Sequence, residues 1–274
     1  SPATCFPLIE KHKVTISSLV PPALSLWLSA AGTRDDNISS LSVIQVGGAK
    51  LSPAVAAKVS DVLSCQLQQV FGMAEGLVNY TRYSDSQWHI ENTQGFPMSS
   101  DDEVRVLNEQ GEQVSNGEVG ELWTRGPYTF RGYYRSPIAN SRAFDSEGFY
   151  CTGDLVRHTN SGHLIVVGRN KDQINRGGEK IDAQEVEDVL LAHENILQVA
   201  LVAMPDELLG EKSCAFIIAK ERLKAVEIRR FLRSQGIADF KLPDVCKFVD
   251  NLPKTAVGKI DKKTLRELVS CVNS

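Results

Sequence analysis

Hydrophobic positions in the first part of the chain alternate between helical spacing and the short unbroken runs typical of buried strands. Residues 41–46 are almost continuously apolar and stop at Gly47-Gly48, a pattern that indicates a strand in a parallel sheet. Ser52-Pro53 then supplies a helix N-cap and a proline at the first helical position. Strand, helix and strand in this order predict an α/β fold with right-handed crossovers. The other elements predicted in this part are helices over 6–13, 23–31 and 53–63 and strands over 14–20 and 66–71.

The pattern of hydrophobic and polar residues changes from about Trp88 to Gly168, where short β-prone segments are separated by Gly, Asn, Asp and Pro. This pattern predicts an antiparallel sheet or a small barrel, with strands over 103–107, 120–125 and 163–167. After Lys171 helices return, opened by the capping pair Asp182 and Glu185. Further strands are predicted over 197–204 and 213–219 and an amphipathic helix over 225–235. We therefore predict an α/β plus α+β fold, with a domain boundary between residues 170 and 171.

Composition excludes several classes of protein. The chain has 274 residues, 42% of them hydrophobic, and 30 basic against 34 acidic side chains. Such a chain is too apolar to be disordered, has no apolar run of the ~18 residues that a membrane span needs, and lacks the positive charge of nucleic-acid binders. The six cysteines are scattered without a C-x-x-C pair, which argues against a zinc site or a disulfide framework. No signal peptide is visible after Ser1, so we expect a cytoplasmic protein.

Five segments combine Gly, charged and hydroxyl residues where a predicted strand should end. Each alone has an ordinary explanation. Gly153-Asp154 could form a turn, Lys259 could be a solvated loop lysine, and Glu75 could begin a helix, where a carboxylate suits the dipole. The segments are residues 69–75, 150–155, 168–173, 176–180 and 253–261.

In this order and spacing the segments resemble the later core motifs of the adenylate-forming superfamily. Gln-Val-Phe-Gly-Met-Ala-Glu at 69–75, Arg-Gly-Pro-Tyr-Thr at 125–129 and Lys-Asp-Gln-Ile-Asn-Arg-Gly-Gly-Glu-Lys at 171–180 are similar to the aryl-acid–AMP ligases of siderophore biosynthesis. The resemblance runs from about Phe6 to Leu268. It implies that ATP and Mg²⁺ are used to adenylate an aryl acid. The acyl group would then pass to the phosphopantetheine thiol of an aryl carrier protein.

The resemblance also implies roles for individual residues. Glu75 would hold Mg²⁺, and Lys259 would reach the α-phosphate and the substrate carboxylate as the second catalytic residue. Asp154 would accept hydrogen bonds from the ribose hydroxyls, a bidentate role that suits its two oxygens. Lys171 would be the hinge about which the small domain rotates. The nucleotide-binding residues implied are Gly48, Phe71, Gly72, Met73, Ala74, Asp154, Arg169 and Lys259, with Phe71 stacked on adenine.

The acid pocket implied by the resemblance is lined by Gln45, Gly47, Val70, Val78 and Asn79. Glycine at 47 leaves room for a ring, and the two valines give flat apolar walls. Valine at 78 leaves space for a 3-hydroxyl, so 2,3-dihydroxybenzoate is favoured over salicylate. The same residues could also be ordinary members of a sheet core. A salicylate–AMP ligase and another aryl- or acyl-CoA ligase remain alternatives.

One departure from the superfamily pattern stands out. The chain has no Gly/Ser/Thr-rich phosphate-binding loop ending in Pro-Lys and no upstream asparagine for the ortho hydroxyl, so backbone N–H groups for the β,γ-phosphates are missing. We therefore expect a fragment, inactive alone. Residues 1–170 would be the later part of a large domain, with an α/β remnant over 1–87 and a small β-barrel over 88–170. Residues 171–274 would be the small mobile domain. A non-catalytic module that binds a carrier protein is the alternative.

Overall fold

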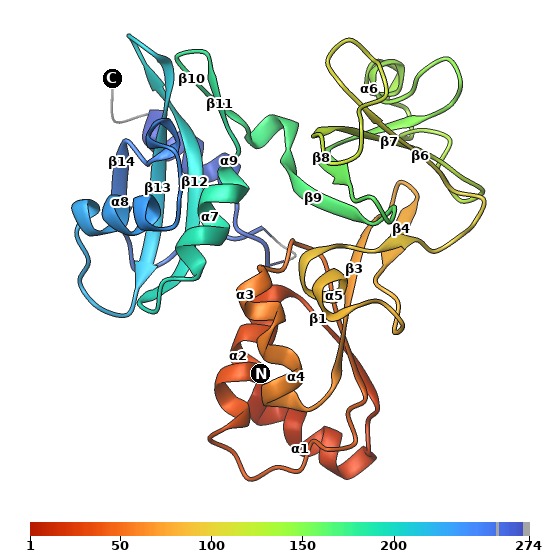
Figure 1. Cartoon of the computed structure of the whole chain (residues 1–274), viewed down its shortest axis with the longest axis vertical. Coiled ribbons are helices and arrows are strands. Elements are labelled where there is room, and N and C mark those ends of the chain that lie inside the picture. Colours follow the sequence, from red (N-terminus) through yellow and green to blue (C-terminus); the bar gives the residue numbers. More distant parts are fainter. Residues whose placement is uncertain (256–257, 271–274) are drawn as a thin grey trace. The chain divides into compact units, whose positions relative to one another are not determined.

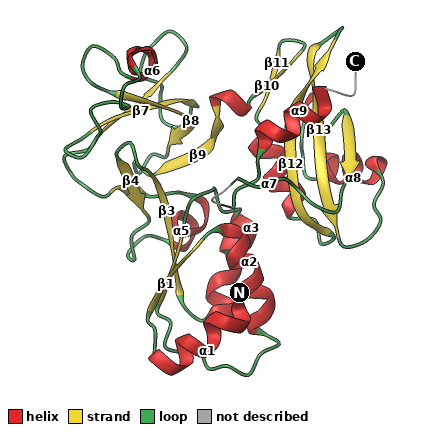
Figure 2. Cartoon of the chain, turned by 180° about the vertical axis from the view of Figure 1, so that it is seen from behind, coloured by secondary structure: helices red, strands yellow, loops and turns green. Residues whose placement is uncertain are grey.

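The computed structural model describes residues 1–255 and 258–270. The chain divides into two compact units, residues 1–166 and 167–274 (Figure 1). Both units mix helices with strands, as Figure 2 shows by colour. The prediction of a mixed α/β fold is confirmed.

The first sheet of unit 1 is built as the apolar runs predicted. Strands β1 (Ile16–Leu19), β2 (Val43–Val46) and β3 (Gln66–Met73) pair in parallel, and β4 (Leu77–Tyr80) and β5 (Phe96–Pro97) continue the sheet antiparallel. The helices of this region are α1 (Pro2–His12), α2 (Pro21–Ala31), α3 (Pro53–Ala56), α4 (Lys58–Leu63) and α5 (Gln87–Asn92). Phe6, Trp27 and Ile44 belong to the core between helices and sheet.

The predicted N-cap at Ser52 is confirmed, because its hydroxyl accepts a hydrogen bond from the Val55 N–H at 3.4 Å. The single helix predicted after it is wrong. The segment forms α3 and α4, divided at Ala57, and the first of these contains only one turn.

The second sheet of unit 1 is open. Its order is β6 (Glu103–Leu107), β7 (Gly120–Arg125), β8 (Tyr150–His158) and β9 (Leu164–Arg169), with α6 (Pro137–Ala143) between β7 and β8. Strands β6 and β7, and β7 and β8, pair antiparallel as predicted. The predicted barrel is wrong: within the described ranges β6 does not pair with β9. Four strands are too few to curl round a packed interior.

Unit 2 has one sheet with a core on each face. The strand order is β11 (Glu179–Ile181), β10 (Ile174–Arg176), β13 (Gly210–Ala219) and β12 (Ile196–Asp206), and β14 (Val245–Phe248) pairs with β13 in parallel. Successive residues of β12 enter different cores: Leu201 packs with α7 (Ala183–Leu191) and α8 (Ala225–Ser234), and Val202 packs with α9 (Lys262–Ser270). Burial on both faces explains the apolar runs that predicted these strands. Short 3₁₀ helices, η1 (Asn170–Asp172) and η2 (Asp239–Lys241), complete the unit.

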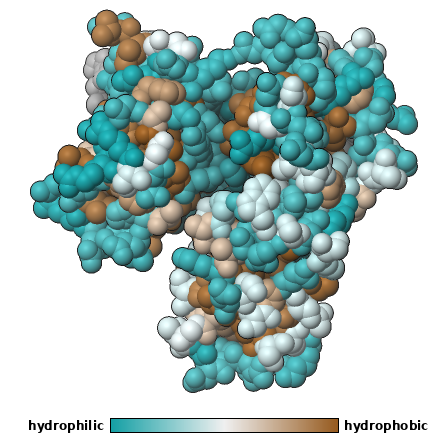
Figure 3. Space-filling view, viewed as in Figure 1, coloured by the Kyte–Doolittle hydropathy of each residue, from teal (hydrophilic) through white to brown (hydrophobic). Residues whose placement is uncertain are grey.

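Along the part of the chain that the structure describes, no helix combines the length and the apolar character that crossing a bilayer requires. The tip of the β12–β13 hairpin is apolar in Figure 3, and Leu208 there is 92% exposed. Five cysteines are free thiols, and Cys271 lies outside the described residues.

Candidate active site

Glu75 lies in the tight turn between β3 and β4. The register pairs Met73 with Leu77 and leaves residues 74–76 as the turn, so Glu75 does not begin a helix. Gly76 has φ +123°, and a Cβ there would lie 2.4 Å from the Cα of Thr129. Only glycine allows this close approach. The Phe130 N–H also donates to the Glu75 carbonyl at 2.9 Å, so the loop 126–130 holds the turn.

Among the described side chains, one makes a hydrogen bond to the half-buried Glu75 carboxylate. The Tyr133 hydroxyl donates to Glu75 Oε1 at 3.1 Å, and no described side chain is recorded against Oε2. Among the described residues no three His, Cys, Asp or Glu side chains gather to form a closed metal site. Mg²⁺ in nucleotide enzymes is usually held by one or two carboxylates, with phosphates and water completing its shell. The residues present therefore fit Mg²⁺ bound together with a nucleotide.

Four of the predicted acid-pocket residues lie on one face of the sheet. Val78 pairs with Gly72, and Val70 is two residues before Gly72 on β3, so Val70 and Val78 point to the same side of the sheet. A Cβ on Gly47 would lie 3.1 Å from the Val70 Cβ, so the end of β2 runs close beside Val70. Gln45 is on this face because it pairs with Gln68, and its Nε2 donates to Gln68 Oε1 at 2.9 Å.

Asn79, the fifth predicted pocket residue, lies on the opposite face. It pairs with Phe71, and Phe71 packs on the core around Leu77 and Val156. The Asn79 side chain is 0% exposed, and neither of its amide atoms has a hydrogen-bond partner among the described residues. Strand alternation shows the separation already in the sequence, since Val78 and Asn79 are adjacent and must point to different sides of the sheet.

A bulge in β8 sets the direction of the Asp154 side chain. Leu122 of β7 lies opposite residues 152–154, because the register shifts between Glu121 and Trp123. Gly153 takes φ +71°, and the Thr152 hydroxyl donates to the Leu122 carbonyl at 2.9 Å. Asp154 is only 4% exposed. Bulges are common beside active sites because they redirect a side chain.

The strand that carries Asp154 packs against the hairpin that carries Glu75. Val156, two residues beyond Asp154, belongs to the same core as Leu77, with Phe71 and Met73 against it. Unit 1 therefore brings together the hairpin residues 71–75 and the strand bearing Asp154, although 79 positions separate Glu75 from Asp154 in the sequence.

Gly48 follows β2 in unit 1, whereas Arg169, Lys171 and Lys259 belong to unit 2. Arg169 ends β9, and the exposed Lys171 lies in η1. The residue after it, Asp172, pairs with Arg266 of α9 at 2.9 Å. The predicted hinge segment is therefore tied to the helix that follows Lys259.

Lys259 stands on a small closed loop. Lys254 and Ile260 form an antiparallel bridge, and the Thr255 N–H donates to the Lys259 carbonyl at 2.8 Å. The Lys259 side chain is exposed. Ala256 and Val257, which belong to the predicted segment 253–261, lie outside the described residues.

The tyrosines that support the Glu75 side chain were not predicted from the sequence. Tyr133 contacts Glu75 from 58 positions away, and Tyr150 lies 3.0 Å from the Tyr133 hydroxyl. Burial, the hydrogen bond with Tyr133 and the charge of Glu75 all raise the pKa of Tyr150. The available signal was the position of Tyr150 at the start of the 150–155 segment.

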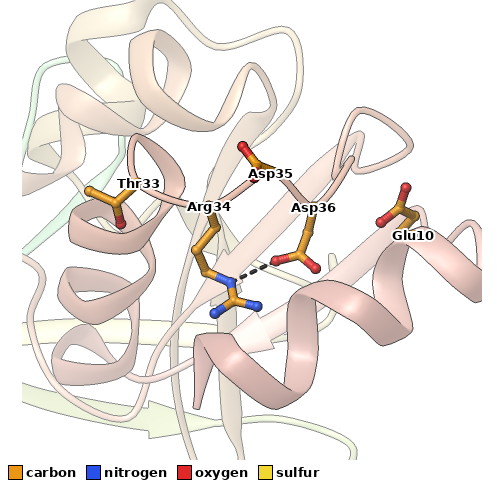
Figure 4. A pocket seen from close by; sticks show the side chains of 5 residues that line it. All are labelled: Glu10, Thr33, Arg34, Asp35 and Asp36. Carbon is orange, nitrogen blue, oxygen red and sulfur yellow. Dashed lines mark hydrogen bonds and ion pairs between the residues drawn. The ribbon is translucent and has the colours of Figure 1, made fainter.

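A surface pocket in unit 1 has a different character. Glu10 of α1 and the loop after α2 line it (Figure 4), and the Arg34 Nε lies 2.6 Å from Asp36 Oδ2. Its lining is polar and largely acidic, and none of its residues belongs to the predicted site. Its residues are Glu10, Thr33, Arg34, Asp35 and Asp36.

Comparisons with known proteins agree with the motifs. Residues 1–134 match the family described as AMP-binding enzyme, and residues 185–259 match the AMP-binding enzyme C-terminal domain. The chain is 60% identical over 269 residues to enterobactin synthase component E of Escherichia coli, covering 97% of this chain and 50% of that protein. It is 55% identical over 271 residues to 2,3-dihydroxybenzoate-AMP ligase of Bacillus subtilis, covering 98% of this chain and 50% of that protein. The chain thus spans about half the length of the curated relatives it matches.

Solved structures show the same fold. The amide bond synthetase McbA from Marinactinospora thermotolerans matches 98% of this chain and 56% of its own, with 27% identity and a TM-score of 0.88. The apo structure of MbtA from Mycobacterium smegmatis matches 97% of this chain and 50% of its own, with 45% identity and a TM-score of 0.60.

Proposed function

Because the chain belongs to the family of AMP-binding enzymes, we propose that it supplies catalytic residues to an aryl-acid–AMP ligase of siderophore biosynthesis. The enzyme would join 2,3-dihydroxybenzoate to AMP at the expense of ATP and pass the acyl group to the phosphopantetheine thiol of an aryl carrier protein. The observation that carries the proposal is the 55% identity to a 2,3-dihydroxybenzoate-AMP ligase along 98% of this chain.

The described side chains suit the first half-reaction. ATP with Mg²⁺ supplies the electrophilic phosphorus and neutralises phosphate charge. Glu75 would hold the cation through Oε2, and Asp154 would accept hydrogen bonds from the ribose. Lys259 would donate to the α-phosphate and the acid carboxylate, where charge develops in the transition state. Positioning and charge neutralisation are the main contributions that a protein makes to such chemistry.

The second half-reaction requires a different arrangement of the two units. Lys171 would be the hinge, since it is exposed in η1, a short distance after the boundary between the units. Rotation there would withdraw Lys259 and present another face of unit 2 to the carrier protein. Domain motion of this kind is a common way to order two reactions on one enzyme.

The identity of the acid depends on Val78. Its side chain shares a face with Val70, and a Cβ on Gly72 would lie 3.3 Å from Val78 Cγ2, so Val78 lies directly beside the Gly72 backbone. We expect Val78→Leu to shift the ratio of kcat/KM for 2,3-dihydroxybenzoate to that for salicylate by about tenfold toward salicylate, because the added methylene would occupy the place of the 3-hydroxyl. Val62→Leu on the exposed face of α4 is the matched control. An unchanged ratio for Val78→Leu would show that Val78 does not line the acid pocket.

The proposed activity is tested by exchange of labelled pyrophosphate into ATP. The 274-residue chain is assayed alone and after being joined to the part of the E. coli relative that it does not cover, with 2,3-dihydroxybenzoate, salicylate and benzoate. We expect exchange by the joined enzyme, fastest with 2,3-dihydroxybenzoate. No exchange with any aryl acid, together with binding of a carrier protein, would favour the non-catalytic module. Thioester formation on free coenzyme A in place of the carrier would favour an acyl-CoA ligase.

A further inference from the structure

A chain of two hydrogen bonds ends on the Glu75 carboxylate. The Tyr133 hydroxyl donates to Glu75 Oε1 at 3.1 Å and lies 3.0 Å from the Tyr150 hydroxyl. A phenol has one proton to donate. Since Tyr133 gives its proton to the carboxylate, Tyr150 must be the donor of the second bond. The direction of the chain is therefore Tyr150 to Tyr133 to Glu75.

The inner tyrosine of this chain is fixed by aromatic packing. Tyr150 is only 7% exposed, and its ring lies 5.1 Å from Phe130 and 5.6 Å from Phe144 between centroids. Phe130 also contacts Tyr133 edge-on at 4.8 Å. The contacts of Phe130 with both tyrosines are edge-to-face, an arrangement that gives an aromatic pair a preferred geometry beyond what burial alone provides.

The backbone of Tyr133 is fixed separately by one side chain of α6. Asn140 Oδ1 accepts from the Tyr133 N–H at 2.7 Å, and Asn140 Nδ2 donates to the Tyr133 carbonyl at 3.0 Å. Gly132 permits this approach, because it takes φ +140° and a Cβ there would lie 3.1 Å from the Asn140 amide. The tyrosine that reaches Glu75 is thus held at its backbone and at its ring.

We propose that Tyr133 is a positioning residue for metal binding: it fixes one oxygen of Glu75 so that the other is presented to Mg²⁺, with Tyr150 and Asn140 holding Tyr133 in place. The inference rests on the metal-binding role assigned to Glu75 under the proposed function. A glutamate side chain has several rotatable bonds, and ordering it on metal binding costs conformational entropy. The hydrogen bond from Tyr133 orders the Glu75 side chain when the protein folds, so less conformational entropy is lost when the cation binds. Because Glu75 Oε2 has no described partner, the hydrogen bond does not compete with the metal.

The test compares neighbouring tyrosines. Pyrophosphate exchange by the joined enzyme is measured against free Mg²⁺ for Tyr133→Phe, Tyr134→Phe, Glu75→Gln and the double variant Tyr133→Phe with Glu75→Gln. Tyr134 is the matched control, since it follows Tyr133 directly, is 83% exposed and has no recorded contact with Glu75. We expect Tyr133→Phe to raise the Mg²⁺ concentration for half-maximal exchange by about tenfold, the size of effect expected for a hydrogen bond to a charged group. The rate at saturating Mg²⁺ is expected to recover, and Tyr134→Phe is expected to match the unmodified enzyme.

The double variant separates a positioning role from a general loss of structure. If Tyr133 acts through Glu75, Tyr133→Phe changes nothing further once Glu75→Gln is present. The same shift in both backgrounds, or no shift for Tyr133→Phe alone, would overturn the inference. A Glu75→Gln enzyme with an unaltered Mg²⁺ response would instead refute the metal-binding role of Glu75, which is a failure of the proposed function.

A structural measurement on the 274-residue chain is independent of exchange. In crystal structures of the two phenylalanine variants, we expect the Glu75 carboxylate to leave its position in Tyr133→Phe and to keep it in Tyr134→Phe. A carboxylate that stays in place without the Tyr133 hydroxyl would refute the positioning role, even if the joined enzyme has no measurable activity.

Discussion

Lys259→Ala is expected to slow adenylate formation by about 10²–10³-fold, the loss typical of removing one preorganised donor from a transition state. The exposed ammonium stands on a loop closed by the Lys254–Ile260 bridge and by the hydrogen bond between Thr255 and Lys259. Closure of the loop limits the positions that the lysine backbone can take. The rate is measured as pyrophosphate exchange by the joined enzyme with 2,3-dihydroxybenzoate.

The same variant is expected to keep the rate of acyl transfer from preformed adenylate to the carrier thiol. In the proposed second arrangement Lys259 is withdrawn from the adenylate, so it takes no part when the thiol attacks the acyl carbon and AMP leaves. Lys254→Ala, an exposed lysine of the same loop, is the control for changes in the loop itself. Equal losses in both half-reactions would contradict the role assigned to Lys259.

Lys262→Met is expected to lower the free energy of unfolding of unit 2 by about 3–5 kcal/mol near neutral pH, because it leaves a buried carboxylate without its cation. The Lys262 Nζ lies 2.7 Å from Glu187 Oε1, and the Glu187 side chain is only 6% exposed. The same oxygen accepts the Leu201 N–H at 2.6 Å, so the pair joins α9, α7 and β12. Urea unfolding followed by circular dichroism measures the difference.

The loss of stability in Lys262→Met is expected to depend on pH. Burial raises the pKa of Glu187, and the attraction of Lys262 opposes that rise. Without Lys262 nothing opposes the rise of the Glu187 pKa on burial. At pH values between the ordinary glutamate pKa and the raised one, Glu187 is therefore protonated in the folded variant and ionised in the unfolded chain. The penalty is therefore largest above the folded-state pKa and shrinks as the pH falls toward the ordinary glutamate value of about 4.3.

Lys263→Met provides the control for this experiment. Lys263 is the next residue of α9 and is exposed, so the change is expected to stay within about 0.5 kcal/mol, as for most surface substitutions. A loss in Lys262→Met that does not change with pH would show that packing of the lysine stem, and not the charge of Glu187, causes it.

The parts of the fold that local patterns predicted are those whose stabilising contacts repeat along the chain. The run 41–46 and the cap at Ser52 depend on neighbours within a few positions, and the structure has the parallel strand and the capped helix there. The turn at 74–76 was not predicted, because it requires the close approach of Gly76 to Thr129, far along the sequence. Whether the second sheet closes into a barrel likewise depends on pairing between β6 and β9, which are far apart in the sequence.

The candidate site shows the same division. The resemblance assigned Glu75 and Asp154 to the site, and the structure places their strands against one core. Tyr133 was not predicted, because a hydrogen bond between residues 58 positions apart leaves no periodic trace. Asn79 was assigned to the acid pocket by resemblance, whereas the period of two along β4 separates it from Val78.

Helix α6 has a consequence for how this protein can change. None of its seven residues is buried, so most substitutions there would leave the folded state as stable as before. Asn140 differs from the other residues of α6, because its amide makes two hydrogen bonds to the backbone of Tyr133, whose hydroxyl donates to Glu75. Under the role proposed for Tyr133, a substitution of Asn140 is expected to change the Mg²⁺ requirement of the joined enzyme through the Tyr133 backbone and hydroxyl.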